Sequence, residues 1–293
     1  MNRKSITLYF FVMVSMFPVI AYGDFFNDVS NAYLPGEVKS IMVGEAEAPI
    51  IEVEAKTPLS LGTAIIFTEP FPSSLTLAEG NSLADLLAEK GWHVVISPVN
   101  LPLAPTPSAD EAAASTPEDD AAQNNQADEA IHPRSNQLTQ YLNFETATSA
   151  LTLQVNALNN YLQNRSGYRM VIAQGMLAAT YFSAAELQPN LHPDTFIAIS
   201  PFWPEDTTNN LLINTMAKAE YPVLDLSLSA FNDWEASTTL KRKIRAKNEL
   251  KIHYRQITIP SSFLAFSIKE TQKNPQIQII ANNTIGWTRH LGW

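Results

Sequence analysis

The side chains that could perform nucleophilic catalysis are few in this sequence. There is no cysteine, which excludes a thiolate nucleophile, disulfides and thiolate metal sites. A serine nucleophile needs an imidazole base within hydrogen-bond reach. The chain offers five imidazoles, those of His93, His132, His192, His253 and His290. His192-Pro193-Asp194 could form a metal-ligand pair, but no second histidine lies near it and a surface turn is favoured. We expect neither a metal site nor a cofactor.

One strand-turn-helix pattern marks where a serine nucleophile would be expected. Residues 168–179 read YRMVIAQGMLAA. In sheet proteins that cleave acyl bonds, the serine lies in a G-x-S-x-G turn between a strand and a helix. This register places Gly175 at the serine position, with Ala173 and Leu177 at the glycine positions. Because glycine has no side chain that could attack a carbonyl, the sequence predicts a vacant nucleophile position.

The partners of such a serine are also missing from their expected positions. Residues 260–289, which follow the last predicted strand, contain no histidine. The loop at 68–72 reads TEPFP, in which the prolines donate no N–H and Glu69 would repel a developing oxyanion. The acid alone has candidates, Asp225 and Asp233, and Asp233 also fits the N-cap of a helix. A serine-triad enzyme is therefore not predicted.

Alternating strand and helix patterns would position these residues. Apolar strand-like runs occur at 37–43, 49–55, 61–68, 92–97, 168–173, 195–200, 223–228 and 252–259. Helical spacing occurs at 81–90, with Asn81 or Ser82 as the expected cap, and at 136–164, 175–187, 207–219, 233–250 and 276–290. Such alternation implies a mainly parallel sheet covered on both faces. The predicted fold class is α/β: an α/β-hydrolase-like three-layer sandwich with a mostly parallel central sheet and N-terminal antiparallel strands.

Four aromatic residues follow two of the predicted strands. Phe202 and Trp203 come after the strand at 195–200, and Phe231 and Trp234 come after the strand at 223–228. Ligands of open α/β sheets bind at the carboxyl ends of strands. The four side chains are therefore candidates for lining an apolar ligand pocket, with a core or lid position as the equal alternative.

The charge of the chain is acidic and unevenly distributed. The 293 residues carry a formal net charge of -10, which argues against a nucleic-acid partner. Residues 103–135 are rich in proline and alanine and contain seven acidic residues against Arg134 alone. With so little apolar surface, this acidic insertion is predicted to be a disordered surface loop.

A basic run, Lys241 to Lys247, contrasts with that insertion. It is typical of a solvated helix face whose cations favour the helix C-terminus. The alternative is contact with an anionic partner or with the chain's own acidic insertion at 103–135.

The first 23 residues have the pattern of a secretory signal peptide. A short basic start precedes an apolar run at 6–20, and Ala21 and Gly23 occupy the two positions that a signal peptidase reads. The run is shorter than the roughly 20 residues of a spanning helix, although an uncleaved anchor is the alternative. We expect cleavage after Gly23, a periplasmic protein with one domain at 24–293, and no transmembrane segment in the mature chain.

Five short segments resemble a known family. They are Gly91-Trp92 with Asn100-Leu101-Pro102, Pro201-Phe202-Trp203-Pro204-Glu205, Pro222-Val223-Leu224-Asp225, Tyr254-Arg255-Gln256 and Ile285-Gly286-Trp287. In this order they resemble uncharacterised exported bacterial proteins with a degenerate α/β-hydrolase-like fold, a domain-of-unknown-function family. The resemblance covers most of the mature chain. It implies the fold and export, and it supplies no substrate.

Three functional hypotheses follow. The first is a non-catalytic α/β-hydrolase-like protein that binds a small apolar or peptide ligand, or an envelope protein. The second is a carboxylic-ester or other acyl hydrolase with a non-standard site, for example one using Ser200 or Ser229. The third is a cell-envelope scaffold that uses its acidic insertion or basic helix as the interaction surface.

Overall fold

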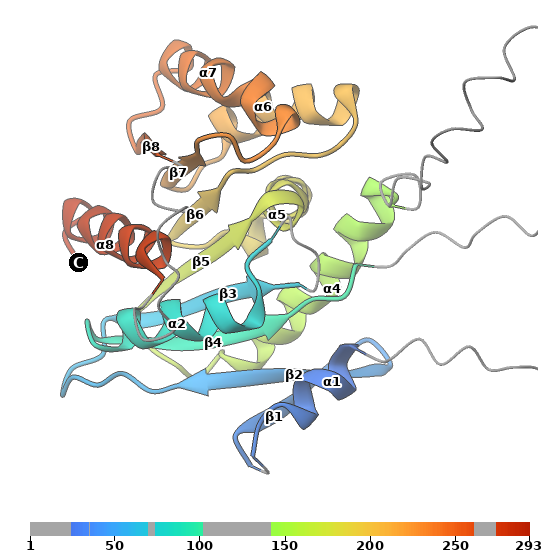
Figure 1. Cartoon of the computed structure of the whole chain (residues 1–293), viewed down its shortest axis with the longest axis vertical. Helices are drawn as coiled ribbons and strands as arrows, with labels where there is room; N and C mark the ends of the chain where they lie inside the picture. Colours follow the sequence, from blue (N-terminus) through green and yellow to red (C-terminus); the bar gives the residue numbers. More distant parts are fainter. Residues whose placement is uncertain (1–24, 35, 70–73, 102–141, 261–273) are drawn as a thin grey trace, which may run out of the picture.

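The computed structural model describes residues 25–34, 36–69, 74–101, 142–260 and 274–293, which surround one eight-stranded sheet (Figure 1). The expected signal peptide and the acidic insertion at 103–135 lie outside these residues. Among the described residues, no helix is both long and apolar enough to cross a membrane. The strands are β1 (Val38–Val43), β2 (Ala46–Val53), β3 (Gly62–Thr68), β4 (Trp92–Pro98), β5 (Tyr168–Gln174), β6 (Thr195–Ile199), β7 (Val223–Leu228) and β8 (Tyr254–Ile259).

The sheet is antiparallel at one side and parallel through the rest. Its strand order is β1-β2-β4-β3-β5-β6-β7-β8. The pairs β1–β2 and β2–β4 are antiparallel, and every pair from β4 to β8 is parallel. The carboxyl ends of six strands therefore share one edge, called here the C-terminal edge. This topology confirms the predicted fold class.

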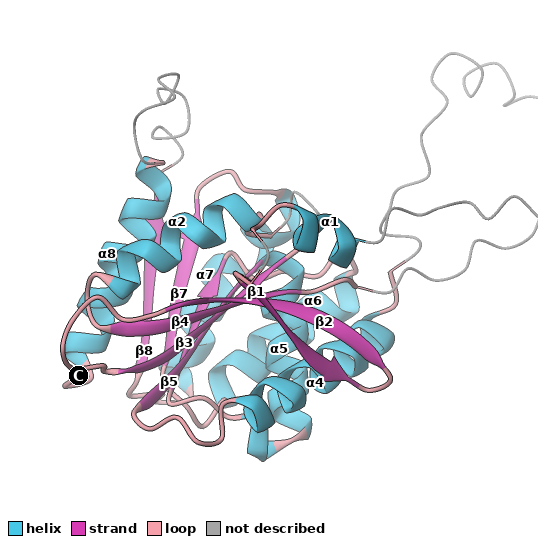
Figure 2. Ribbon diagram, turned by 90° about the horizontal axis from the view of Figure 1, so that it is seen from below, coloured by secondary structure: helices cyan, strands magenta, loops and turns pink. Residues whose placement is uncertain are grey.

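Helices cover both faces of the sheet, as the ribbon view makes plain (Figure 2). One layer contains α4 (Phe144–Tyr161), α5 (Gly175–Leu187), α6 (Asp206–Lys218) and α7 (Asp233–Asn248). The other contains α1 (Phe25–Asn31), α2 (Leu77–Ala88) and α8 (Pro275–His290). Each layer closes its own hydrophobic cluster against the sheet.

The central strands are apolar because both of their faces are buried. Every residue of β3 is buried. Ile65 and Phe67 face the α4–α7 layer, whereas Ala64 and Ile66 face the α2–α8 layer. This alternation explains why such strands read as continuous apolar runs.

Several predicted boundaries need correction. The helix predicted at 81–90 begins at Leu77, and its cap is Thr76, whose side chain accepts from the Glu79 N–H in a capping box. Asn81 and Ser82 are therefore interior residues of α2. The helix predicted at 136–164 is described only as α4, which Asn143 caps. The last strand begins at Tyr254, and α1 was not predicted at all.

Candidate functional site

The predicted vacant position lies in a sharp turn at the C-terminal edge of the sheet. Gln174 ends β5, and α5 begins at the next residue, Gly175. Gly175 has φ +60°, a left-handed conformation that costs an L-residue roughly 1–2 kcal/mol. Ala173 and Leu177, on either side of the turn, are fully buried. The strand-to-helix elbow of the predicted pattern is thus formed, and the residue at its apex has no side chain.

The described histidines lie at the opposite edge of the sheet. His93 is the second residue of β4, and His192 and His253 precede β6 and β8. His290 ends α8, and the preceding turn of that helix reaches the start of β6, where Trp287 Nε1 donates to Thr195 Oγ1 at 2.8 Å. Strand β5 has seven residues, so its length separates these imidazoles from Gly175 by about 20 Å. His132 lies outside the described residues.

The loop after β3 brings a carboxylate toward the elbow. Glu69 is buried and accepts a hydrogen bond from the Ser74 hydroxyl. Ser74 Oγ also lies 3.0 Å from the carbonyl oxygen of Gln174, the residue before Gly175. A buried carboxylate at this position is the reverse of what an oxyanion site needs, which supports the sequence argument. The rest of the 68–72 loop, apart from Thr68, lies outside the described residues.

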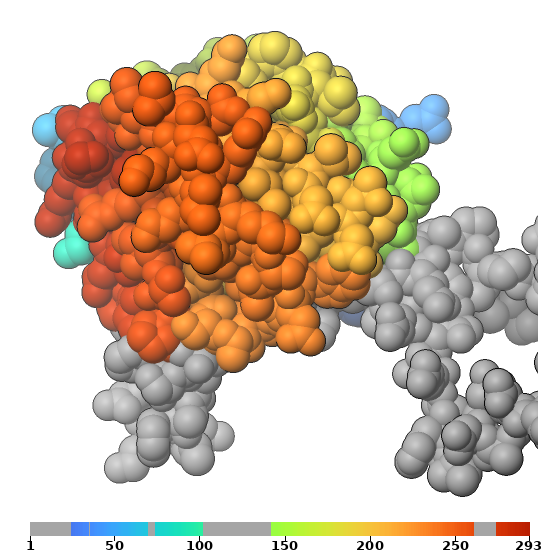
Figure 3. Space-filling model, turned by 90° about the horizontal axis from the view of Figure 1, so that it is seen from above, coloured from blue at the N-terminus to red at the C-terminus, as the bar shows by residue number. Residues whose placement is uncertain are grey.

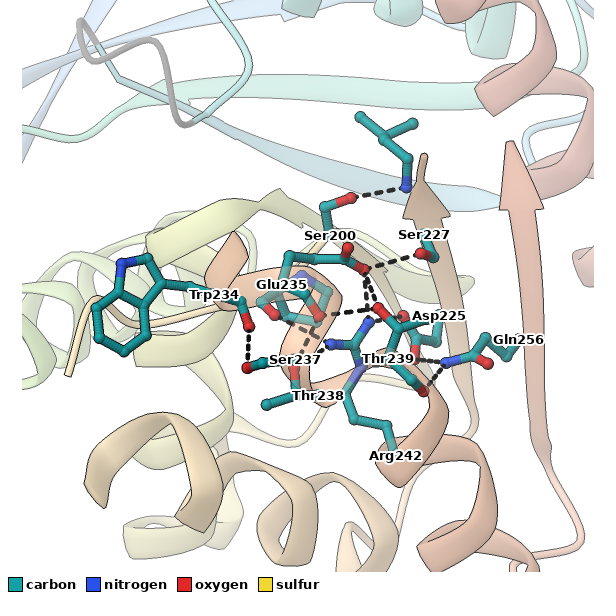
Figure 4. A network of polar contacts seen from close by, with 12 residues as sticks. Ser200, Asp225, Ser227, Trp234, Glu235, Ser237, Thr238, Thr239, Arg242 and Gln256 are labelled. Atoms are coloured by element: carbon teal, nitrogen blue, oxygen red, sulfur yellow. Dashed lines mark hydrogen bonds and ion pairs between the residues drawn. The ribbon is translucent and has the colours of Figure 1, made fainter. Parts of the chain in front are cut away.

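The first acid candidate, Asp225, is held by a buried ion pair (Figure 4). Asp225 and Arg242 are both fully buried in their side chains, and Arg242 Nε donates to Asp225 Oδ2 at 3.0 Å. The same carboxylate accepts from the Tyr254 hydroxyl at 2.7 Å and from Gln256 Nε2 at 2.8 Å. With three donors already bound, Asp225 has no role left as the orienting acid of a triad.

A second carboxylate completes this buried network. Glu235 Oε1 accepts from Arg242 Nη2 at 2.9 Å and from the Ser227 hydroxyl at 2.8 Å. Burial alone would lower the pKa of Arg242, but the charges of Asp225 and Glu235 outweigh it and raise that pKa. Arg242 was predicted within a solvated basic face, and the structure corrects this. Its side chain is among the largest that are fully buried.

The second acid candidate, Asp233, is an exposed residue at the first position of α7. The N-cap is its neighbour Asn232, whose side chain accepts from the Glu235 N–H at 2.8 Å. The predicted N-cap is therefore off by one residue. An Asp in the first turn still interacts favourably with the helix dipole.

A cavity of about 340 Å³ opens beside the elbow. Strand ends at Gln174 and Leu228 contribute to it, as do the first turns of α2 and α8. Its lining mixes apolar side chains with hydroxyls and amides: Ser74, Leu75, Thr76, Glu79, Gln174, Leu228, Ser229, Ala230, Phe231, Gln276, Ile277 and Ile280. The volume is at the lower end of the range for small-molecule sites.

Only one of the four aromatic candidates lines this cavity. Phe231 does so and also packs edge-on against Phe202, with ring centroids 5.9 Å apart. Phe202 and Trp203 are buried core residues, and Trp203 packs against Phe144 at 4.9 Å. Trp234 packs partly buried against the same core. The core alternative therefore holds for Phe202 and Trp203.

The two serines weighed as nucleophiles differ in environment. Ser200 is fully buried with φ +43°, and its hydroxyl oxygen accepts from the Leu228 N–H at 2.8 Å. Ser229 is partly exposed and lines the cavity. Of the two, Ser229 alone has a hydroxyl that a ligand in the cavity could reach.

A further polar cluster lies at the opposite edge of the sheet. Ligand atoms of Glu52, Glu54 and His93 all lie within 4.8 Å of one another. Lys39 already pairs with Glu52 at 2.7 Å, and Arg165 pairs with both carboxylates at 3.2 and 3.3 Å. Two cations thus balance two carboxylates, so the residues present form an ion-pair network.

Sequence reasoning missed Arg242 and the residues contributed by α2 and α8. A polar residue within the buried strand VLDLSL was the available signal for Arg242, because a buried carboxylate requires a cation or several donors. Ser74, Gln276 and Ile277 carry no comparable signal. They come together because α2 and α8 are in contact and both line the cavity beside the ends of β5 and β7.

Comparisons with known proteins give the fold alone. No protein-family model matches the sequence, and no curated protein matches it either. A dienelactone hydrolase from Anabaena variabilis is similar in structure, with a TM-score of 0.50, 14% identity, and coverage of 86% of this chain and 96% of that chain. A putative dienelactone hydrolase from Klebsiella pneumoniae is similar with a TM-score of 0.55 and 11% identity, and the match covers 85% of this chain and 96% of that chain. Thermogutta terrifontis esterase 2 phosphonylated by cyclosarin is similar with a TM-score of 0.53 and 10% identity, and the match covers 86% of this chain and 94% of that chain.

Proposed function

We propose that this chain is a non-catalytic α/β-hydrolase-fold protein that binds a small, largely apolar ligand in the cavity beside Gly175. The observation that carries the proposal is the elbow itself. The turn that presents a nucleophile in this fold is formed, yet its apex is a glycine with φ +60°. Because the elbow is formed but carries no hydroxyl oxygen that could attack a substrate, it favours a binding role over a catalytic one.

The surroundings of the elbow support the same reading. The four described imidazoles lie about a strand length away from Gly175, beyond the reach of any hydroxyl at the C-terminal edge. Asp225 is neutralised by Arg242. Among the three members of a serine triad, the histidine is too distant and the aspartate is already paired with Arg242. The serine position is occupied by glycine, which has no side chain.

The lining of the cavity indicates an uncharged ligand. Leu228, Phe231, Ile277 and Ile280 would contact an apolar body, and the amides of Gln174 and Gln276 offer both donors and acceptors. The described lining contains no Lys or Arg. An anionic ligand would therefore lack a counter-charge among these residues, and Glu79 would repel it.

We also propose that the protein acts outside the cytoplasm. The basic start, apolar run and small residues of positions 1–23 support export and cleavage after Gly23. Membership of the exported family that the five segments resemble is part of the same proposal. A periplasmic ligand or envelope protein would then be the partner.

Catalysis is tested with a fluorophosphonate probe and with short- and medium-chain nitrophenyl esters. We expect neither labelling nor hydrolysis by the wild type. Gly175→Ser should also remain inactive, because a new hydroxyl at the elbow would still have no imidazole within reach. Labelling of the wild type that disappears in Ser229→Ala, or in any other single serine variant, would instead establish the hydrolase alternative.

Binding is tested with N-phenyl-1-naphthylamine, a small uncharged dye that fluoresces in apolar sites. The wild type should enhance its fluorescence, and Ser229→Phe should abolish the enhancement by filling the cavity. Leu240→Phe is the matched control, since Leu240 is 66% exposed on α7 and does not line the cavity. Equal enhancement by wild type and Ser229→Phe would place the dye elsewhere and remove the support for this cavity.

A further inference from the structure

A groove runs along α6 on the face of the molecule opposite to α2 and α8. It consists of two adjoining hollows of about 380 Å³ each, which share Asn214 and Arg245. The first hollow reaches Phe144 at the start of α4, and the second lies between α6 and α7. Figure 3 shows the surface where α6 and α7 lie side by side, in lighter and darker orange. We call this the α6–α7 groove.

The α6–α7 groove combines exposed apolar surface with positive charge. Leu211 and Ile244, which line it, are 58% and 49% exposed. Lys218, Lys241 and Arg245 line it as well, against a single acidic residue, Glu186. A partner that fits would present carboxylates beside a few apolar side chains.

Arg245 has an unused donor in this groove. One end of its guanidinium pairs with Glu249 at 2.7 Å. Its Nε–H is buried and has no acceptor among the residues that the structure describes. A buried donor without an acceptor is unfavourable, and an added carboxylate would relieve that cost.

We propose that the acidic insertion, residues 103–135 of the same chain, binds in the α6–α7 groove. Its composition is complementary: seven carboxylates against one arginine, with Asp128-Glu129 followed by Ala130-Ile131 as an acidic pair beside an apolar residue. The carboxylates would pair with Lys241 and Arg245, and Ile131 would cover the exposed apolar side chains. This proposal is independent of what the cavity beside Gly175 binds.

The connection of the insertion to the fold favours this occupant. The described chain resumes at Leu142, two residues before Phe144, which lines the groove. An extended chain from Asp128 to Leu142 spans about 46 Å, whereas the length of α6 is about 20 Å. The whole groove is therefore within reach, at an effective concentration on the order of millimolar for a short tether.

Zero-length carbodiimide cross-linking of the full chain at low salt tests the proposal. It joins a carboxylate to a lysine only when the two are in contact, and mass spectrometry locates the link. We expect links from residues 103–135 to Lys241 or Lys218, in several-fold excess over links to Lys247. Lys247 is the matched control, because it is exposed on α7 but does not line the groove. High salt should reduce the links several-fold.

A charge swap distinguishes contact from mere proximity. Asp128→Lys with Glu129→Lys should remove the links at that pair. Adding Lys241→Asp should restore them, now between the new amines at positions 128 and 129 and the new carboxylate at position 241. Mixing light and isotope-labelled protein identifies the source of each link. Links between the two isotopic forms would assign the groove to a second copy, and equal links at Lys241 and Lys247 would mean non-specific attraction. Either result overturns the proposal.

Discussion

Arg242 is the cation that pairs with two buried carboxylates, those of Asp225 and Glu235. Its guanidinium reaches Asp225 on β7 and Glu235 on α7, and hydroxyls or amides of neighbouring residues occupy the remaining positions around the two carboxylates. Such a network costs desolvation energy when it forms, so it is weak evidence for high stability. Its clearer consequence is that removal of one member leaves the others buried without compensation.

Replacement of Arg242 by Met should therefore be strongly destabilising. Asp225 and Glu235 would retain their carboxylates in a buried site without a counter-ion, and the expected loss is about 3–5 kcal/mol of unfolding free energy. Urea denaturation measures it. Lys243→Met, at an exposed position on the same helix that does not line the α6–α7 groove, should change stability by no more than about 0.5 kcal/mol. Similar values for the two variants would contradict the role given to Arg242.

The sequence predicts some of these residues and misses others for a physical reason. Gly175 could be placed because a strand-turn-helix pattern fixes a local register. Arg242 could not be placed, because a count of charges over 241–247 ignores helical phase. On the helix, Arg242 shares a face with Glu235, Thr238 and Ala246, and all four are buried. Of the aromatic candidates, Phe231 lines the cavity, whereas Phe202 and Trp203 follow a strand end yet are buried in the core.

At the scale of elements, the strands and most helix starts were predictable: α5 and α7 begin at the predicted residue, and α6 and α8 begin one residue earlier. The start of α2 was not predicted. A parallel strand with two covered faces is mostly apolar, so β3 and the central parts of β5 and β7 are evident from sequence. A helix start depends on a cap that lies outside the apolar pattern. Thr76 begins α2 before the first buried leucine, and Gly80 and Asn81 within the helix disguise it.

The end of α7 offers a test of backbone strain. Leu250 has φ +54° and is 82% exposed, and the Lys251 N–H returns to the Ala246 carbonyl at 3.0 Å. This is the position after a helix where glycine is preferred. Leu250→Gly should raise the unfolding free energy by about 1 kcal/mol, detected as a higher Tm. Ile252→Gly, equally exposed but without positive φ, should bring no gain, and a gain of the same size there would contradict the argument.

The ion pairs between β2, β4 and Arg165 give a pH dependence. Burial lowers the pKa of His93, and the nearby charge of Arg165 lowers it further. The charges of Glu54 and Glu52 raise that pKa by less, so the net effect is a lowered pKa. The unfolded chain then takes up the proton first as pH falls. Stability should decrease as pH falls below about 6.5.

The variant His93→Gln isolates this contribution. Between about pH 7.5 and about pH 5.5, its unfolding free energy should fall less than that of the wild type. The window stays above the range in which Glu52 and Glu54, whose pKa values are lowered, take up protons. Parallel pH profiles for the two proteins would show that His93 is not responsible.

At the scale of the whole molecule, positions 1–23 predict a signal peptide whose removal leaves Asp24 as the first residue of the mature chain. Protein recovered from the periplasm should therefore have the mass of a chain that starts at Asp24. Gly23→Leu, which places a large residue where the peptidase requires a small one, should leave the precursor uncleaved. A recovered chain that retains residues 1–23 would favour an N-terminal anchor instead.

The strand order has a consequence for when this molecule can fold. At the centre of the sheet, Gly62 of β3 pairs with Tyr168 of β5, across β4, the acidic insertion and α4. Closing a loop of that length is entropically slow, and β3 cannot be completed before β5 has been synthesised. The nascent chain should therefore stay open for most of its synthesis. Under the export proposed above, a chain that collapses late would remain unfolded long enough to be translocated.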